Sequence, residues 1–367
     1  MLNDIYTISI WITIGITFIF CLFLSILSIP KTEHLHNYRI ARYVMACAYL
    51  SLGIMNVVEL MVQSSIMDIQ LTRMIALLVC LFQSFLFTYT NVTLINIHFA
   101  TKRKILFELA PIFLLCILTP IVLATNSTPI YSDILFYAFI LYYISVLVRY
   151  TILFRRNYRD YILKMDNFFA GQESKRFRWI NLSFYSALSM GIMALFVTLF
   201  FSIVIGILFS LFIIGFYSYY GIQFINYAFL FQHIEAAITE EEIGKEKKTT
   251  SNPIRNYSLL EINIEKWIAD KRFLEQGINI ESCALELNTN RTYLSDYVNT
   301  CLRKTFKEWI SELRINESKA LLLKYPDKSI LEISEVVGFS DKSNFGRLFA
   351  KHTGMSPKAW RISEINT

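Results

Sequence analysis

The sequence lacks the residue patterns on which most enzymes depend. It has no glycine-rich phosphate-binding loop, no nucleophile elbow and no kinase-type catalytic set. It also lacks clusters of residues at metal-ligand spacing. Its six cysteines do not show the paired spacing of metal ligands, and His34 and His36 have no further ligand nearby. We therefore predict a protein that is not an enzyme and that has no metal site, no cofactor and no disulfide.

Charged residues are also scarce, and they are unevenly distributed. Only 17% of the 367 residues are charged, whereas 54% are hydrophobic, which is more than an average soluble domain carries. The charges are concentrated in the last third of the chain and in a few short segments, so we predict one region in lipid and one in water. The net charge of +6 suits both an anionic membrane surface and nucleic acid, and does not distinguish them.

Long apolar runs in residues 1–231 predict about seven transmembrane helices, since a helix needs about 20 apolar residues to cross the hydrocarbon core. The last two runs are nearly continuous, and we expect a tight turn near Ser202 to separate them. The first run lacks a basic leading segment and a cleavage site, so we expect it to stay as a span. The runs lie near residues 5–29, 43–66, 74–99, 105–125, 131–153, 179–200 and 204–231.

Lysine and arginine in the short connections predict the orientation of these spans, because such residues stay on the cytoplasmic side. They follow the first, third and fifth spans, whereas the opposite connections contain little beyond Arg73. We therefore expect the N-terminus outside and the C-terminus in the cytoplasm, in the inner membrane of a bacterium. The basic residues are Lys31, Arg39, Arg42, Lys102, Arg103, Lys104, Arg155, Arg156, Arg159, Lys164, Lys175, Arg176 and Arg178.

Several polar side chains lie at membrane depth, where buried polar groups need partners. Asn56 and Glu59 stand three apart on one helical face. One interpretation places them in a pocket that senses a proton or an apolar or amphipathic ligand, and the other makes Glu59 a protonated carboxyl bonded to a neighbouring helix. The predicted outside connections are too short for a separate sensor domain, so the bundle itself would receive the stimulus. The further polar residues are Gln83, Asn91, Asn96 and Glu108.

The segment after the last span is predicted to link two domains. Residues 232–248 are typical of a polar helix whose sparse apolar stripe, Ile234, Ile238 and Ile243, could serve as a homodimer seam. Residues 249–253 break this helix, because Pro253 cannot continue it. The predicted organisation is therefore a transmembrane bundle at 1–231, a cytoplasmic linker at 232–256 and a soluble domain at 257–367.

The soluble domain is predicted to contain two similar helical segments. The first has a short helix over 282–287, a turn at 288–290 and a second helix over 291–301. Its buried face carries Tyr293, Leu294, Tyr297 and Val298. The polar half that faces outward resembles a helix that enters a DNA major groove, where Asn and Arg contact base edges. The predicted DNA-facing residues are Asn290, Arg291, Thr292, Ser295 and Asn299, with Asp296 beside them.

The second segment repeats this pattern, with a helix over 330–337, a turn that uses the permissive backbone of Gly338, and a recognition helix over 341–352. Phe345, Leu348 and Phe349 are expected in the core, and Asp341 at the helix N-terminus. A longer helix over 306–323 joins the two segments. The predicted DNA-facing residues are Ser340, Lys342, Ser343, Asn344 and Arg347.

Residues 260–363 resemble the AraC family of double helix-turn-helix regulators. The resemblance rests mainly on Ile333-Ser334, Val337-Gly338-Phe339, Ser340-Asp341-Lys342-Ser343-Asn344-Phe345, Arg347-Leu348-Phe349, Gly354-Met355-Ser356-Pro357 and Trp360-Arg361. It implies two recognition helices that read successive major-groove segments of double-stranded DNA. Arg303 stands where relatives usually have glycine, and Asp296 where they often have a basic residue. We therefore expect a strained left-handed cap at Arg303 and weaker or altered contacts from the first segment.

The combined prediction is an all-α protein, a polytopic transmembrane bundle followed by an AraC-type domain, that couples a membrane or small-molecule signal to transcription. Its expected partners are double-stranded DNA, the lipid bilayer, a second copy of the chain, an unidentified ligand and RNA polymerase. The alternative is a transporter or receptor with a cytoplasmic regulatory tail, which predicts flux. No inverted repeat supports that alternative. A variant of the main hypothesis has proteolysis near residues 232–256 release the DNA-binding domain.

Overall fold

The computed structural model describes residues 1–29, 36–63, 69–96, 99, 101–124, 129–171, 178–200, 202–231 and 257–365. Within these residues every regular element is a helix, so the predicted all-α class is confirmed. The chain forms two compact units, which we call the bundle unit (Met1–Tyr161 and Arg178–His233) and the C-terminal unit (Ile162–Phe177 and Ile234–Thr367). The predicted linker helix at 232–248 and the break at 249–253 lie outside the described residues.

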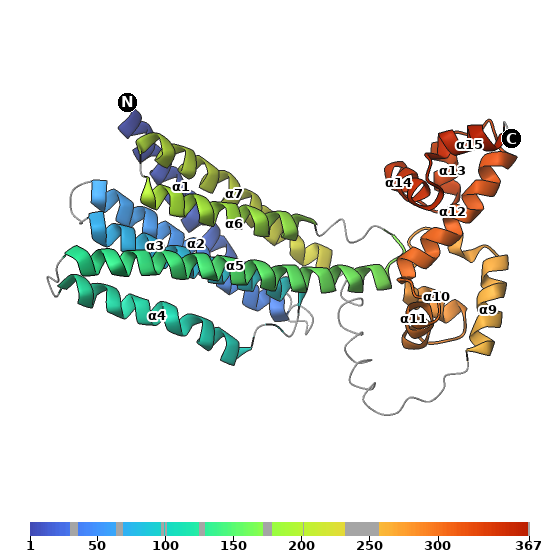
Figure 1. Ribbon diagram of the computed structural model, residues 1–367, viewed down its shortest axis with the longest axis horizontal. Helices are drawn as coiled ribbons and strands as arrows, with labels where there is room; N and C mark the ends of the chain where they lie inside the picture. Colours follow the sequence, from blue (N-terminus) through green and yellow to red (C-terminus); the bar gives the residue numbers. More distant parts are fainter. Residues whose placement is uncertain are drawn as a thin grey trace. The chain divides into compact units, whose positions relative to one another are not determined.

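Seven long helices account for residues 1–231 (Figure 1). In the bundle unit α1 packs against α2 and α7, and α3 packs against α2, α4 and α6. The predicted turn near Ser202 separates α6 from α7, as expected. The helices are α1 (Leu2–Ile26), α2 (His36–Gln63), α3 (Ile69–Ile95), α4 (Lys102–Ala124), α5 (Pro129–Phe168), α6 (Arg178–Leu199) and α7 (Ile203–Phe231).

Six of these helices are long and apolar enough to cross a membrane, judged by length and composition of the described residues. They are α1, α2, α3, α5, α6 and α7. Helix α4 is not among them, and its first turns carry Lys102, Arg103, Lys104 and Glu108. Helix α5 also differs from the predicted span at 131–153, because it continues to Phe168. The prediction of about seven spans is therefore supported for six helices and stays a prediction for α4.

Helix α1 has its polar side chains inside and its large apolar side chains outside. Ser9, Thr13 and Thr17 are at most 5% exposed. Each donates a hydrogen bond to a backbone carbonyl one turn earlier, at 2.7–2.8 Å. The large side chains that α1 exposes include Ile8, Trp11, Ile12, Ile19, Leu22 and Ile26. This is the reverse of the polarity of a helix at the surface of a water-soluble protein.

The polar residues predicted at membrane depth have hydrogen-bond partners, as expected for groups removed from water. Most of these bonds join different helices, so they also fix how the helices pack. Tyrosines of α7 take part in two of them. The bonds connect Gln83 with Ala48, Ser51 and Tyr217, Asn91 with Phe87 and Tyr220, Asn96 with Asn157, and Glu108 with Arg149 and Tyr150.

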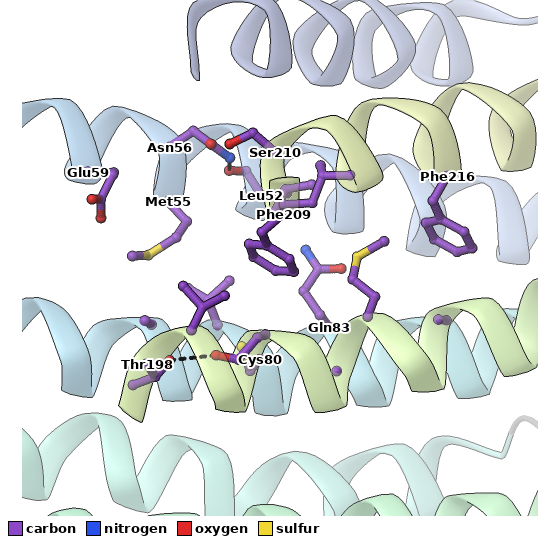
Figure 2. A pocket seen from close by; sticks show the side chains of 18 of the residues that line it. Leu52, Met55, Asn56, Glu59, Cys80, Gln83, Thr198, Phe209, Ser210 and Phe216 are labelled. Atoms are coloured by element: carbon purple, nitrogen blue, oxygen red, sulfur yellow. Dashed lines mark hydrogen bonds between the residues drawn. The ribbon is translucent and has the colours of Figure 1, made fainter. Parts of the chain in front are cut away.

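A cavity of about 730 Å³ lies inside the bundle unit, and it is lined by side chains from all the long helices except α4. Figure 2 shows Met55 of α2, Phe209 of α7 and Gln83 of α3 pointing into the space between their helices. Its volume is within the range of about 300–1,000 Å³ that small-molecule sites occupy.

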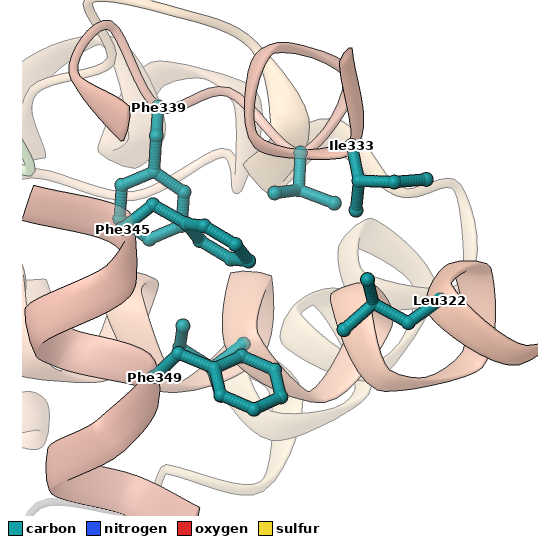
Figure 3. Packing of buried hydrophobic residues seen from close by; sticks show 7 residues of the cluster. Leu322, Ile333, Phe339, Phe345 and Phe349 are labelled. Atoms are coloured by element: carbon teal, nitrogen blue, oxygen red, sulfur yellow. The ribbon is translucent and has the colours of Figure 1, made fainter. Parts of the chain in front are cut away.

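The C-terminal unit contains eight shorter helical elements among its described residues 257–365. Its core includes Phe339, Phe345 and Phe349, which pack with Leu322 and Ile333 (Figure 3). Each buried phenylalanine contributes roughly 2–3 kcal/mol through removal of its ring from water. The elements are α9 (Ser258–Ala269), η4 (Arg272–Leu274), α10 (Ile280–Glu286), α11 (Arg291–Thr300), α12 (Phe306–Lys324), α13 (Ile330–Val336), α14 (Lys342–Thr353) and α15 (Pro357–Ile365).

Candidate DNA-binding site and bundle cavity

The two predicted segments fold as two helix-turn-helix units, α10 with α11 and α13 with α14. Their first helices begin in the same way, at capping boxes formed by Asn279 and by Ser329. In the second unit the Ser329 hydroxyl accepts from the backbone nitrogen of Glu332, and the Glu332 carboxylate accepts from that of Ser329. A side chain that satisfies the free N–H groups of the first turn fixes where the helix starts.

The turns of the two units also share one backbone conformation. Asn288 has φ of 53° and Gly338 has φ of 85°, both in the left-handed region. Asparagine tolerates this region better than most side chains, and glycine occupies it without a steric penalty. In the second unit no side chain fits, because a Cβ on Gly338 would lie 2.3 Å from the carbonyl oxygen of Leu274. The second turn therefore requires glycine, whereas the first does not.

The five predicted DNA-facing residues of the first unit lie on α11 or at its N-cap. Asn290, Thr292 and Asn299 are exposed, and Arg291 and Ser295 are half-buried. The Asn290 side chain caps the helix by accepting from a backbone nitrogen at 2.9 Å. Asn299 donates from Nδ2 to the Ser295 carbonyl at 2.8 Å. Thr292 and Asn299 thus lie on the exposed face, while Asn290 also has a structural role.

The five predicted residues of the second unit lie along α14 and just before it. Ser340, Lys342, Ser343 and Arg347 are exposed. Asn344 is only 7% exposed, and its Oδ1 accepts from Nη2 of Arg347 at 3.2 Å. The expectation that Asn344 faces outward is therefore wrong, because the helix rotates this position to the edge of the buried face beside Phe345. Asp341 caps α14 by accepting from the Ser343 nitrogen at 2.8 Å, as expected.

The two positions at which the chain departs from the AraC pattern have distinct structural outcomes. Arg303 has φ of 54°, so the predicted left-handed conformation is confirmed at an exposed, non-glycine residue. Asp296 accepts a hydrogen bond from the hydroxyl of Tyr257 at 3.0 Å. The Tyr257 ring packs against Tyr293 and Tyr297. Asp296 therefore ties α11 to the residue before α9, an interaction that no sequence spacing indicated.

The predicted sensing residues both line the bundle cavity. Glu59 is half-buried, and its Oε1 accepts from the hydroxyl of Tyr6 on α1 at 3.2 Å. Asn56 donates from Nδ2 to the Leu52 carbonyl at 2.9 Å. The bond to Tyr6 is the neighbouring-helix contact expected of a structural carboxyl, while the position in the cavity wall is the one expected of a ligand-binding group.

Sequence reasoning missed one segment of the C-terminal unit, namely the end of α5 and the residues that follow it. Phe168 lies under the guanidinium of Arg291, and Asp166 pairs with Lys307 of α12. An apolar spacing could have revealed this extension, since Phe154, Tyr158, Tyr161, Met165 and Phe168 recur at helical intervals.

A fold with two helix-turn-helix units joined by one long helix defines a DNA-binding domain. A protein-family model described as a helix-turn-helix domain matches residues 283–363. Residues 283–363 therefore form a DNA-binding helix-turn-helix domain of the AraC type.

Several similar proteins match about a quarter to a third of this chain. The melibiose operon regulatory protein of Escherichia coli strain K12 is 30% identical over 120 residues, which are 32% of this chain and 39% of that protein. An HTH-type transcriptional regulator of Pseudoalteromonas carrageenovora is 27% identical over 127 residues, 35% of this chain and 74% of the relative. The Msm operon regulatory protein of Streptococcus mutans is 36% identical over 85 residues, 23% of this chain and 30% of the relative. No solved structure gives a significant match.

Proposed function

We propose that this chain is a membrane-bound, sequence-specific transcription regulator that couples a membrane or small-molecule signal to DNA binding. The observation that carries the membrane placement is the reversed polarity of α1, in which Ser9, Thr13 and Thr17 are buried while residues such as Trp11 and Ile19 are more than half exposed. Such a surface is stable against lipid and is costly in water. The length and composition of six helices support the same placement.

The proposed topology places the N-terminus outside and the DNA-binding domain in the cytoplasm of a bacterium, at the inner membrane. It is supported by basic residues in the connections after the first, third and fifth spans, which the positive-inside rule assigns to the cytoplasm. We propose domain boundaries at 1–231 for the sensor bundle, 232–256 for the linker and 257–367 for the DNA-binding domain. A homodimer through the linker and a contact with RNA polymerase are further parts of this proposal.

For the DNA contacts, we propose that the exposed residues of the two recognition helices reach the duplex directly. These are Asn290, Thr292 and Asn299 in the first unit and Ser340, Lys342, Ser343 and Arg347 in the second. Arg291 and Ser295 would contribute from the half-buried edge of α11. Asn344 would act indirectly, because its Oδ1 orients the guanidinium of Arg347. Arginine is well suited to this position, since its planar fork can bind a guanine edge through two hydrogen bonds.

The test is DNA binding by the full chain in lipid nanodiscs. We expect it to bind DNA from upstream of its own gene more tightly than a scrambled duplex of the same length, across a salt series. Arg347→Ala should relax the selectivity if Arg347 contacts a base, and should reduce the salt slope by about one if it contacts a phosphate. Arg361→Ala serves as the matched control, because Arg361 lies outside both recognition helices and donates to the Pro326 carbonyl. Equal affinity for both duplexes, together with no site in a genome-wide selection, would refute sequence-specific binding.

A transporter with a regulatory tail is the second candidate, and the 730 Å³ cavity is the observation that favours it. It predicts solute flux by the full chain in proteoliposomes, which a regulator would not show. Proteolytic release of the DNA-binding domain is a variant of the main proposal. Finding only the full-length chain in cells in which the target gene is induced would exclude that variant.

A further inference from the structure

We infer that the bundle cavity binds an amphipathic molecule that carries a protonated amine at one end of an apolar chain. This inference rests on the proposed sensor function and names the chemical class of its ligand. It follows from the uneven distribution of charged groups along the cavity wall, from the position of the Glu59 carboxylate, and from the cavity's size.

The charged residues of the cavity wall, and several of its polar ones, lie at one end of the bundle. Asn3, Tyr6 and Thr7 lie in the first turns of α1, while Glu59 lies near the end of the antiparallel helix α2. The N-terminal turns of α3 and α7 reach the same end, where α3 contributes Thr72 and Arg73. Toward the middle of the helices the wall is mainly apolar and aromatic, with Phe87, Phe184, Phe209 and Phe216, although Gln83, Ser84, Thr88 and Ser210 also line it. The charged residues of the wall, Glu59 and Arg73, therefore lie at one end of the cavity, and a mainly apolar wall extends beyond them.

The Glu59 carboxylate is the group best placed to recognise a ligand head. Burial of a carboxylate is costly unless hydrogen bonds or a cation compensate, and Tyr6 supplies one bond, at 3.2 Å. A carboxylate has room for about four hydrogen bonds, and an ammonium group donates three. Asn56, one helical turn away, is held in place by its bond to Leu52 and adds a second polar group beside the carboxylate. A primary ammonium head complements this pair.

The interior favours an unbranched or weakly branched apolar chain. Met55 of α2 and Phe209 of α7 both point into the cavity, as Figure 2 shows. Methionine adapts its shape to irregular apolar ligands. Arg73 is exposed at the same end of the cavity, so an anionic head is the competing possibility that the experiment must separate.

The experiment measures saturable binding of three probes to the full chain in nanodiscs at pH 7, with empty nanodiscs subtracted. The probes are dodecylamine, dodecanol and dodecanoic acid, which share a chain length and differ in the head. We expect dodecylamine to bind about tenfold more tightly than dodecanol, the effect of one charged hydrogen-bonded contact. Glu59→Gln should remove this preference and leave dodecanol binding unchanged. A preference for dodecanoic acid, or equal affinities in the wild type, would overturn the inference.

Two further variants test the location of the site. Met55→Trp should fill the cavity and weaken the binding of all three probes. Ile54→Trp is the matched control, because Ile54 is the preceding residue and is 52% exposed on the outer face of α2. Equal effects of the two variants would place the probes on the outer surface. If dodecylamine binds without changing DNA affinity, the binding site is supported and the proposed coupling to DNA is refuted. If the chain binds DNA but no probe shows saturable binding, only the binding site is refuted.

A different observation carries a second proposal, which concerns the end of α5 within the C-terminal unit. The segment 162–171 makes polar contacts with the first helix-turn-helix and with α12. Asp166 accepts from Lys307 at 2.7 Å, Phe169 forms an antiparallel bridge with Asn279, and the nitrogen of Ala170 donates to Ile278 at 3.2 Å. Because Asn279 is the N-cap of α10, the bridge reaches the start of the helix-turn-helix.

The same segment engages a predicted DNA-reading side chain. The Phe168 ring is 3% exposed, and its centroid lies 4.6 Å from the guanidinium carbon of Arg291. Cation–π contacts of this kind are favourable, particularly where water is excluded. An arginine stacked in this way cannot turn toward a duplex without giving up the contact. We propose that segment 162–171 restrains the first recognition helix and competes with DNA for Arg291.

The test is Phe168→Ala in the full chain, measured as affinity for its own upstream DNA. We expect affinity to rise about threefold to tenfold, as loss of one cation–π contact implies. Leu163→Ala is the matched control, since Leu163 lies five residues earlier on the same helix and is 49% exposed. In Arg291→Ala the further change Phe168→Ala should give no gain. Unchanged or weaker DNA binding by Phe168→Ala would overturn the proposal and make the segment a support of the domain.

Discussion

Arg314 donates from Nη1 to the carbonyl oxygen of Gly338 at 2.9 Å and thereby joins α12 to the turn of the second helix-turn-helix. The same guanidinium donates to the carbonyls of Phe273 and Glu275, which precede the first helix-turn-helix. Arg314 is only 4% exposed, and burial lowers its pKa to about 10. One side chain therefore fixes the second DNA-reading unit, and the segment that precedes the first unit, to the helix between the two units.

Arg314→Ala should destabilise the C-terminal unit by roughly 3 kcal/mol, because three buried carbonyls lose a charged donor. Arg314→Lys should recover only part of this loss, since one ammonium cannot reproduce the planar fork. Hydrogen exchange of α12 amides in the full chain measures the effect. Protection equal to that of the wild type in Arg314→Ala would show that water replaces the guanidinium without cost.

The two turns predict costs of different size when each residue is replaced by alanine. Gly338→Ala should cost at least about 2 kcal/mol, because the new Cβ meets the Leu274 carbonyl and φ is 85°. Asn288→Ala should cost about 1 kcal/mol or less, since only the left-handed strain of a side chain with φ of 53° is involved. The two costs are compared by thermal unfolding of the full chain, in the transition in which the DNA-binding domain unfolds. Similar costs at the two positions would contradict the proposed difference.

Arg303→Gly is expected to stabilise the domain. The exposed Arg303 has φ of 54°, and glycine relieves this strain by about 1 kcal/mol, reduced by its larger entropy when unfolded. Arg303→Ala keeps the strain and serves as the control for loss of the charge. Hydrogen exchange at the end of α11 is the measurement, and slower exchange in the alanine variant than in the glycine variant would refute the argument.

Acid should loosen the start of α12. The backbone nitrogen of Thr305 donates to the Glu308 carboxylate, which lowers the pKa of Glu308 below its ordinary value of 4.5. Because the folded pKa is lower than the unfolded one, the stabilisation is present above pH 4.5 and is lost as the pH falls through the lowered value. Glu308→Gln should flatten the fall in melting temperature between pH 6 and pH 3. If Glu308→Gln kept the full pH dependence of the melting temperature, that dependence would come from other carboxylates.

Local signals in the sequence predicted much of the C-terminal unit. The long helix expected over 306–323 spans Phe306–Lys324, because the Thr305 and Glu308 capping box marks its start and apolar spacing marks its buried face. The burial of Asn344 could not be predicted in the same way. It lies next to the apolar stripe of α14, and its burial depends on the partner Arg347 rather than on spacing.

Contacts between distant segments were beyond sequence reasoning. The bond from Tyr257 to Asp296 joins residues 39 positions apart, and no pattern of either segment indicates it. An apolar stripe in the sequence indicates the extension of α5. A search based on hydropathy nevertheless places the end of the span at Arg155 and Arg156. The apolar run ends where we propose that α5 leaves the lipid. The helix continues beyond that point because its last turns pack in the C-terminal unit.

Helix α5 runs unbroken from Pro129 to Phe168, so the helix fixes the directions of the side chains at its end relative to one another. Each residue of an α-helix turns the chain by about 100° and advances it by about 1.5 Å. A single residue inserted between Asp166 and Phe168 would therefore turn these two side chains by about a further 100° relative to each other, so that the contacts with Lys307 and Arg291 could not both be kept. Descendants of this chain should accordingly tolerate changes of composition along the exposed face of this segment far better than insertions within it.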